Sequence, residues 1–507
     1  MLAPDYLDHA PDRLILLWQQ AEDDILRDVA RRIGKMDTLT PTANWQLWRY
    51  QQTEAVRKNV VKLLARYTGK SEAEIRRLMK EAATAALEAE DEIYYHYGKE
   101  PTPFEESTPL QNLLNAGYRQ TAGSFSNLTA TTANTVSGAF EQALDRAWLQ
   151  VSSGAFDYKT AVKRAVDGLA DSMPYVTYPS GHRDTLEVAY RRAVLTGVNQ
   201  TGAKLQEARM DEMGASFVEV TAHGGARPSH AVWQGRRYHR GGAVDYLGQH
   251  YEDFESATGY GTGAGLCGWN CRHTFFVVFP ELGSPPAWTR ESLEALNARD
   301  IEYNGQKCTR YEISQMQRAR ERAVRKWKRR YLAEDAAGAD TTASAMKLRQ
   351  ARQSLADFTR ATGGRVDSAR TSVHGFGRSA SSKASYAARK QERFNAANTE
   401  LQQMREAGTI KAKGRLIESP SAPNEINFAS DHVLQRWAER GMGPMDAERI
   451  IRSSKVAMSQ RNGTQTCYYS ELGFVAIGQD GNVSSIGPLD EGGKKLMEVV
   501  KKHGIPH

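Results

Sequence analysis

The sequence predicts a multidomain chain that is mainly α, with a small α+β middle domain at about residues 215–285 and a C-terminal α+β domain. At 507 residues the chain is too long for a single ordinary hydrophobic core. Apolar residues recur at the three- and four-residue steps of a helix over most of its length. Short runs typical of strands occur in the middle of the chain and near its C-terminus.

Residues 1–115 are expected to form an N-terminal helical region. Over 11–35 the apolar side chains follow helical spacing, and Gly34 is placed to end that helix. Ser71 and Glu74 have the spacing of a capping box, which predicts that another helix begins at Ser71.

Residues 116–214 are expected to form a second helical region, with helices over 138–172 and 184–213. Between 120 and 136 the chain is rich in Ser, Thr, Asn and Ala and has little periodicity. This composition predicts an exposed connection between helices.

Residues 215–300 are expected to form a small mixed α/β domain rich in Cys and His. The alternation over 217–221 and the apolar run over 274–279, which Pro280 ends, predict two strands. Five side chains in this region are of the types that zinc prefers, thiolate and imidazole. They are His223, His230, Cys267, Cys271 and His273.

Three interpretations of these five residues remain open. Cys267, Cys271 and His273, with either His223 or His230, have the right atoms for a structural zinc site. Alternatively, the cysteines pack as small apolar residues and the polar groups hydrogen-bond locally. In the third interpretation the segment holds the catalytic ion of a metal-dependent nuclease, for which Asp245 and Asp253 are the nearest candidate carboxylates.

Residues 301–365 are expected to form a basic helical region. The chain carries a net charge of +7, yet residues 301–400 alone hold 21 Lys and Arg against 10 Asp and Glu, an excess of +11. A helix over 311–331 carries much of this charge. It faces nucleic acid or an acidic protein surface, or it is a solvated helix face. The candidate nucleic-acid-binding residues are Arg318, Arg322, Arg325, Lys326, Lys328 and Arg329.

Residues 366–425, rich in Ser, Ala, Gly and Arg at their start, are expected to be a flexible linker. Residues 426–507 then form the C-terminal α+β domain. The expected helices span 430–441, 444–454 and 490–503, and the expected strands lie near 456–459, 465–470, 473–478 and 482–487.

Composition also indicates the cellular compartment in which the chain is made. No apolar stretch is long enough for a transmembrane helix, and the N-terminus lacks the pattern of a signal peptide. We therefore expect synthesis in a cytoplasm. In that reducing compartment the cysteines indicate metal ligands or free thiols rather than disulfides.

Ordered sequence blocks over about residues 10–375 carry a resemblance to a known family. The blocks are 28–33, 39–46, 178–182, 191–193, 196–201, 218–223, 226–230, 233–235, 270–273 and, in the basic helix, 311–328. In this order they resemble the phage minor capsid protein 2 family, within the broader group of portal-associated, Mu F-like head proteins. Several blocks in the same order are far more specific than any one of them.

The resemblance implies a structural minor capsid protein of a tailed bacteriophage, acting in head assembly or in DNA packaging or ejection. It implies a place in the virion, in the capsid interior or at the portal vertex. The implied partners are the portal and the major capsid protein, with packaged DNA as a further candidate. It suggests no catalytic residues within 1–375.

The start of the C-terminal domain, 428–442, is similar to compact RNase toxin domains of the barnase, EndoU, colicin and RelE-like group (the BECR fold). The resemblance implies metal-independent RNA cleavage, in which a base accepts the proton of a 2′-hydroxyl and cations stabilise the phosphate. The candidate residues are His432, Arg436, Arg440, Tyr468 and Ser470. The resemblance also implies host RNA as a partner of this domain. Alternatively, His432 and the arginines lie on an exposed helix, while Trp437 and Leu434 pack on the sheet.

Overall fold

The computed structural model describes residues 2–36, 42–172, 175–178, 183–420, 426–428, 434–435, 437 and 439–506. The chain divides into two units, Met1–Ser381 (unit 1) and Ser382–His507 (unit 2). The prediction of a mainly α chain with a C-terminal α+β region is confirmed.

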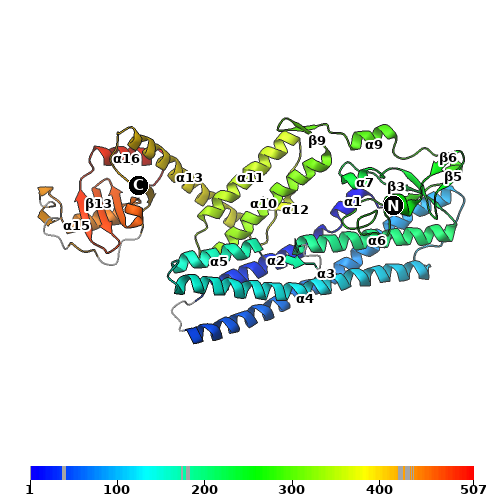
Figure 1. Cartoon of the computed structure of the whole chain (residues 1–507), viewed down its shortest axis with the longest axis horizontal. Helices are drawn as coiled ribbons and strands as arrows, with labels where there is room; N and C mark the ends of the chain where they lie inside the picture. The colour runs from blue at the N-terminus through cyan, green and yellow to red at the C-terminus, as the bar shows by residue number, and fades with distance from the viewer. Residues whose placement is uncertain are drawn as a thin grey trace. The chain divides into compact units, whose positions relative to one another are not determined.

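Unit 1 is built on helices that lie side by side, most of them long (Figure 1). They are α1 (Pro4–His9), α2 (Asp12–Ile33), α3 (Thr42–His96), α4 (Thr108–Ser152), α5 (Tyr158–Ser172) and α6 (Leu186–Met213). A short antiparallel pair, β1 (Tyr175–Thr177) and β2 (Arg183–Thr185), precedes α6. The helices share one apolar core, in which the ring of Trp18 stacks on that of Tyr190 with the centroids 3.6 Å apart.

Three helix boundaries differ from the sequence-based expectation. The single helix expected over 138–172 is interrupted, because α4 ends at Ser152 and α5 begins at Tyr158. Ser71 does not begin a helix but is buried inside α3, where its hydroxyl donates to the carbonyl oxygen of Tyr67 at 2.8 Å. Residues 120–136 belong to the continuous helix α4 rather than to a connection, so the expected boundary near 115 also falls inside α4. Phe125 and Val136 of this segment are buried in the core, and such packing outweighs weak local preferences.

Two glycines allow α4 and α6 to approach closely. A Cβ at Gly117 of α4 would lie 2.2 Å from Oγ1 of Thr201, and one at Gly197 of α6 would lie 2.2 Å from Oγ1 of Thr121. Each threonine hydroxyl donates to the carbonyl oxygen of the glycine one turn earlier in its own helix, at 2.9 Å in α4 and 2.7 Å in α6. The contact therefore leaves no space for a larger side chain at either glycine.

The middle of unit 1 forms a small mixed domain around a three-stranded antiparallel sheet of order β4-β3-β7. The strands are β3 (Phe217–Val220), β4 (Arg237–His239) and β7 (Phe275–Val277), so both expected strands are present. The domain also contains α7 (Pro228–Ala231), β5 (Val244–Tyr246), β6 (Gln249–Tyr251), α8 (Phe254–Thr258), the 3-10 helix η1 (Pro280–Leu282) and α9 (Arg290–Leu296). The antiparallel pair β8 (Ile301–Tyr303) and β9 (Gln306–Cys308) follows and packs with the helices after it.

The expected basic helix is α10 (Arg310–Ala336), which α11 (Thr342–Thr362) and α12 (Ser368–Thr371) follow. It begins with a capping box: the side chain of Thr309 accepts from the amide of Glu312, and the Glu312 carboxylate accepts from the amide of Thr309. α10 packs against α11 along its length and against α2 and α5 on its other side.

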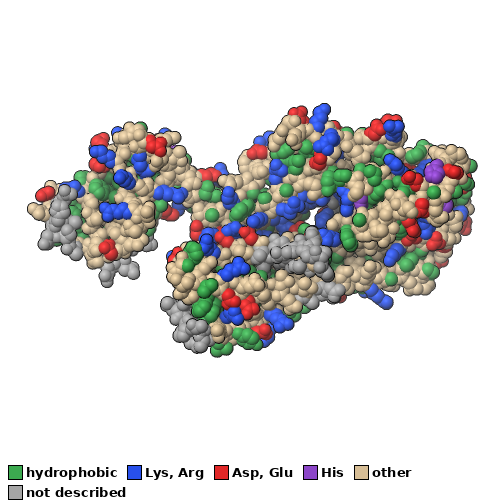
Figure 2. Space-filling view, viewed as in Figure 1, with side chains coloured by type: hydrophobic (Ala, Val, Ile, Leu, Met, Phe, Trp, Pro, Cys, Tyr) green, Lys and Arg blue, Asp and Glu red, His purple; other side chains and the backbone are tan. Residues whose placement is uncertain are grey.

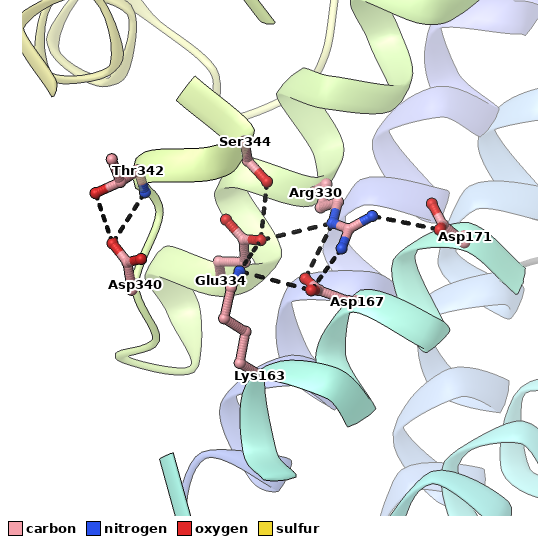
Figure 3. A network of polar contacts seen from close by, with 8 residues as sticks. All are labelled: Lys163, Asp167, Asp171, Arg330, Glu334, Asp340, Thr342 and Ser344. Atoms are coloured by element: carbon pink, nitrogen blue, oxygen red, sulfur yellow. Dashed lines mark hydrogen bonds and ion pairs between the residues drawn. The ribbon is translucent and has the colours of Figure 1, made fainter. Parts of the chain in front are cut away.

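A polar network joins α10 to α5 and α11 (Figure 3). Arg330 lies 2.5 Å from Asp167 of α5, and Nζ of Lys163 lies 2.6 Å from Oε1 of Glu334. Ser344 of α11 donates to the same Glu334 oxygen at 2.8 Å. Burial raises the pKa of Glu334 above its usual value, although the hydrogen bonds from Lys163 and Ser344 favour the carboxylate. The network therefore holds three helices around one nearly buried acid.

Unit 2 has a five-stranded antiparallel sheet of order β10-β11-β12-β13-β14. Its strands are β10 (Arg415–Glu418), β11 (Val456–Gln460), β12 (Gln465–Ser470), β13 (Gly473–Gly478) and β14 (Val483–Gly487), with the 3-10 helix η2 (Arg461–Gly463) before β12. Helices α13 (Arg378–Glu406) and α16 (Glu491–Lys502) cover one face, and α15 (Pro444–Ser453) covers the other. The elements after 443 coincide with the expected ones.

The segment expected to be a flexible linker, 366–425, contains α12, α13 and β10 instead. Phe394, Ala397 and Leu401 form a buried face of α13 that packs in the core of unit 2. Ala, Gln, Arg and Lys favour helix, so this Ser- and Ala-rich segment folds once that face is buried. The helix expected over 430–441 lies largely outside the described residues. Among the helices that the structure describes, none is apolar over a length that could span a membrane.

Candidate metal centre

The sheet of the middle domain brings the two halves of the Cys/His segment together. Val220 of β3 pairs with Phe275 of β7, so the connection after β3 and the loop before β7 meet at the same end of the sheet. His230 lies on α7 in the first of these, and Cys271 and His273 lie in the second.

Three buried side chains, His230, Cys271 and His273, place their ligand atoms within 4.8 Å of one another. Sγ of Cys271 lies 3.7 Å from Nδ1 of His230 and 3.6 Å from Nδ1 of His273. In a tetrahedral zinc site with Zn–S bonds of about 2.3 Å and Zn–N bonds of about 2.1 Å, sulfur and nitrogen lie about 3.6 Å apart. The spacing of these atoms therefore fits zinc.

The second ring nitrogen of each histidine fixes the orientation of the imidazole. Nε2 of His230 donates to the carbonyl oxygen of Ala264 at 2.9 Å, and Nε2 of His273 donates to Oε1 of Gln234 at 2.9 Å. With the proton on Nε2, the lone pair of each Nδ1 is free to bind a metal beside Cys271. Outer partners of this kind are typical of histidines that ligate metals.

The other two predicted ligands, Cys267 and His223, lie next to this group. The thiol of Cys267 donates to the carbonyl oxygen of His273 at 3.6 Å. The ring of His223 stacks on that of His273 with the centroids 4.4 Å apart, and its Nδ1 accepts from the amide of Gly225 at 3.1 Å. All five predicted side chains are thus brought together, and three of them form the closely spaced set.

Burial sets the protonation of the centre. Desolvation lowers the pKa of both His230 and His273 and raises the pKa of both Cys267 and Cys271. Without a cation, the imidazoles and thiols are therefore neutral near pH 7. A metal that binds here must displace the thiol proton, because the thiolate is the ligand.

Two residues outside the predicted set hold the loops in place. Asn199 of α6 donates from Nδ2 to the carbonyl oxygens of Cys271 at 3.0 Å and His273 at 3.1 Å. Oε1 of Gln234, besides contacting His273, accepts from the amide of His223 at 3.0 Å. Both side chains are buried. The sequence analysis did not single out either residue, although both lie within family blocks, 196–201 and 233–235.

The candidate nucleic-acid-binding residues of α10 lie at different depths. Arg325 and Arg329 are buried. Arg329 pairs with Glu22 and Asp23 of α2, each at 3.2 Å, and Arg325 pairs with Glu187 of α6. These two arginines therefore connect α10 to α2 and α6.

The other four are less buried. Lys326 pairs with Asp171 at 3.0 Å, and Lys328 donates to the carbonyl oxygen of Thr371 at 2.5 Å. Desolvation lowers the pKa of Lys328 to about 8. Arg318 and Arg322, about one turn apart, line a cavity together with the Cys/His loops.

In unit 2 the candidate residues His432 and Arg436 lie outside the described residues. Nη1 of Arg440 donates to the carbonyl oxygen of Ile486 at 2.6 Å. Tyr468 is buried in the core beside α15, and Ser470 is buried at the end of β12. These three described side chains are therefore engaged in structural contacts.

Comparison with known proteins identifies one family. A family model described as phage minor capsid protein 2 matches residues 2–360, which is nearly all of unit 1. No curated protein and no solved structure matches the chain.

Proposed function

Because this chain belongs to the phage minor capsid protein 2 family, we propose that it is a portal-associated structural component of the phage head that acts in head assembly or in DNA packaging or ejection. Membership of this family supports the structural role and the location in the virion. The observation behind it is the match over 2–360, which spans almost the whole of unit 1. The portal and the major capsid protein are the proposed partners.

Exposed apolar side chains on the long helices support docking on another head protein. Leu47 and Tyr50 near the start of α3, and Leu149 near the end of α4, are exposed. The two helix ends are neighbours, because Trp45 of α3 stacks on Trp148 of α4 with the centroids 5.7 Å apart. Exposed apolar groups that gather at one end of a helix pair are typical of interaction surfaces.

Quantitative mass spectrometry of purified heads tests the proposal. We expect the protein in heads from wild-type phage and its loss from heads assembled without the portal. Equal amounts in both preparations would contradict portal association and leave a role elsewhere in the capsid. Leu47→Asp with Leu149→Asp should also reduce incorporation, whereas Val366→Asp, at another exposed apolar residue of unit 1, should not.

We also propose that His230, Cys271 and His273 hold a structural zinc ion, with Cys267 or His223 as candidates for the fourth ligand. The sulfur–nitrogen spacing of 3.6–3.7 Å supports this. Inductively coupled plasma mass spectrometry of the full chain should find about one zinc ion per chain, as a site with a single metal requires.

Cys271→Ser should abolish the zinc content, and Cys467→Ser, at a buried cysteine of unit 2, should leave it unchanged. Zinc retained in Cys271→Ser would contradict the assignment. A wild-type chain that purifies without metal would favour the alternative in which these side chains only pack and hydrogen-bond. Zinc-dependent DNA cleavage would support the metal-dependent nuclease alternative instead.

A second candidate function is an RNase-like effector in unit 2. The arrangement of helices and an antiparallel sheet in unit 2 fits it, whereas the burial of Tyr468 and Ser470 does not favour their direct contact with RNA. The test is RNA cleavage by the full chain, compared with His432→Ala. Equal activity in both, or no activity in either, would remove this candidate.

A further inference from the structure

A cavity of about 740 Å³ lies in unit 1 between α10, α6 and the Cys/His loops. This volume falls within the range of about 300–1,000 Å³ typical of small-molecule sites. Among the described residues that line it, nine are Arg or Lys and three are Asp or Glu. Figure 2 shows Lys and Arg side chains gathered in a hollow of unit 1 between α10 and α6.

Part of this positive charge is neutralised and part is not. Five of the nine basic side chains have carboxylate partners: Arg325 and Arg329 pair with carboxylates of α2 and α6, Arg191 with Asp12, Lys326 with Asp171 and Arg370 with Asp367. In contrast, Arg227 donates from Nη2 to a neutral acceptor, the carbonyl oxygen of Trp269, at 2.7 Å. Arg322 is exposed on α10, and no described carboxylate lies within ion-pair distance of it. The cavity therefore retains positive charge that an anion would neutralise.

The type of basic side chain in the cavity indicates which type of anionic ligand it would bind. Eight of the nine basic side chains are arginines, and Lys326 is the exception. The planar guanidinium presents a fork of donors that matches phosphate oxygens in pairs, whereas the ammonium of lysine acts as a point charge. Tyr311, at the start of α10, adds an aromatic ring to the lining, and such rings stack on nucleobases.

The size and shape of the site favour a small ligand over a duplex. The charged side chains line a concave cavity rather than an exposed ridge, so a double helix would reach only those at its rim. His230, Cys271 and His273 line the same cavity. A metal cation bound by these three side chains would add to the positive charge of the cavity. The arginines carry their charge with or without that metal.

We propose that this cavity binds the phosphate groups of a nucleotide, either free or at the end of a nucleic-acid strand. The ligand class follows from the excess of arginine, the cavity volume and the aromatic ring. The arginines and Tyr311 are different residues from the proposed zinc ligands, although both sets line this cavity. Phosphate binding would add an activity to the proposed structural role.

Isothermal titration calorimetry of the full chain tests the proposal. The probes are ATP, inorganic triphosphate, a single-stranded oligonucleotide with a 5′-phosphate, the same oligonucleotide with a 5′-hydroxyl, and an aspartate-rich peptide. Each titration is run with zinc-loaded and with chelator-treated protein, so that loss of the metal and loss of phosphate binding are seen separately.

We expect ATP and triphosphate to bind, and Arg227→Gln with Arg322→Gln to weaken that binding by about tenfold or more, because the variant loses charge-assisted hydrogen bonds to the phosphate groups. Arg360→Gln is the matched control, since this arginine is exposed on α11 and pairs with Asp357. Thermal unfolding of each variant shows whether it is folded.

Selective binding of the 5′-phosphorylated strand over the 5′-hydroxyl strand would support the proposal and identify a strand end as the source of the phosphate. Binding of ATP without either strand would support a free nucleotide. The proposal is overturned if no phosphate probe binds, if the folded double variant binds like wild type, if both strands bind equally and without dependence on the two arginines, or if the peptide binds as tightly as ATP.

Discussion

At the crossing of α4 and α6, a single methyl group should be costly. In Gly197→Ala the new Cβ would lie 2.2 Å from Oγ1 of Thr121, so we expect overpacking to lower the free energy of unfolding by about 1–3 kcal/mol. Chemical denaturation measures it. Gly123→Ala is the control, because that glycine of α4 has open space around it and the change should stabilise the helix by about 0.5–1 kcal/mol. Equal effects of the two substitutions would contradict the close packing.

Glu90 of α3 should make the stability of unit 1 depend on pH. It is fully buried, and desolvation raises its pKa from 4.5 to about 8. Between these values the unfolded chain ionises this group while the folded chain keeps it protonated. Its contribution is therefore complete below pH 4.5 and decreases as pH rises to about 8, by about 1.4 kcal/mol per pH unit.

Glu90→Gln should remove this component. Thermal unfolding between about pH 5 and 8 should show the variant gaining on wild type as pH rises. Glu88→Gln, an exposed neighbour in the same helix, should follow wild type throughout. If the difference between Glu90→Gln and wild type does not change with pH, the carboxyl is ionised in the folded chain.

Residue types in the sequence indicated the side chains of the candidate metal centre, but not the residues that hydrogen-bond to its loops. Thiols and imidazoles are visible as ligand types in a sequence, and all five candidates meet in the fold. Asn199 and Gln234 carry no such signal, because an amide can hydrogen-bond almost anywhere. Their roles depend on where α6 and α7 lie against the loop before β7, which sequence periodicity does not specify.

At the scale of elements, the attachment of α10 to α2 should depend on Arg329. Arg329→Met would leave Glu22 and Asp23 buried without one of their cations, and we expect a loss of about 3–5 kcal/mol in the free energy of unfolding. Arg360→Met removes an exposed ion pair of α11 and should cost less than about 1 kcal/mol. Denaturant titrations of both variants check this, and a loss for Arg329→Met as small as that of the control would contradict it.

The ends of helices and strands could be predicted where the apolar periodicity stops at a residue that breaks helices or strands. The helix expected over 444–454 is α15, and the strands after it appear within a residue or two of their expected limits. The expected connection over 120–136 contains no proline, and its one glycine, Gly123, lies inside α4. Hydroxyls such as that of Thr132 donate to the carbonyl oxygen one turn back, that of Leu128 at 2.7 Å. Polar composition alone therefore does not distinguish a loop from a helix whose other face is buried.

At the scale of the whole molecule, the two units should unfold separately. Each has its own hydrophobic core, so differential scanning calorimetry should show two transitions. If zinc staples the middle domain, chelation or Cys271→Ser should lower only the transition of unit 1, since a ligand stabilises the unit that binds it. A single transition, or an equal shift of both, would contradict this arrangement.

The paired glycine–threonine contacts between α4 and α6 also restrict how the helices can be arranged. Gly117 faces Thr201 and Thr121 faces Gly197, so the same Gly-x-x-x-Thr spacing runs in opposite directions with local two-fold symmetry. A slide of one turn would set Thr121 against Thr201, or leave Gly117 opposite Gly197. Only one antiparallel register of the two helices places a threonine against each glycine. Replacements at these positions should therefore be accepted in pairs across the two helices, a covariation that would be visible among relatives of this chain.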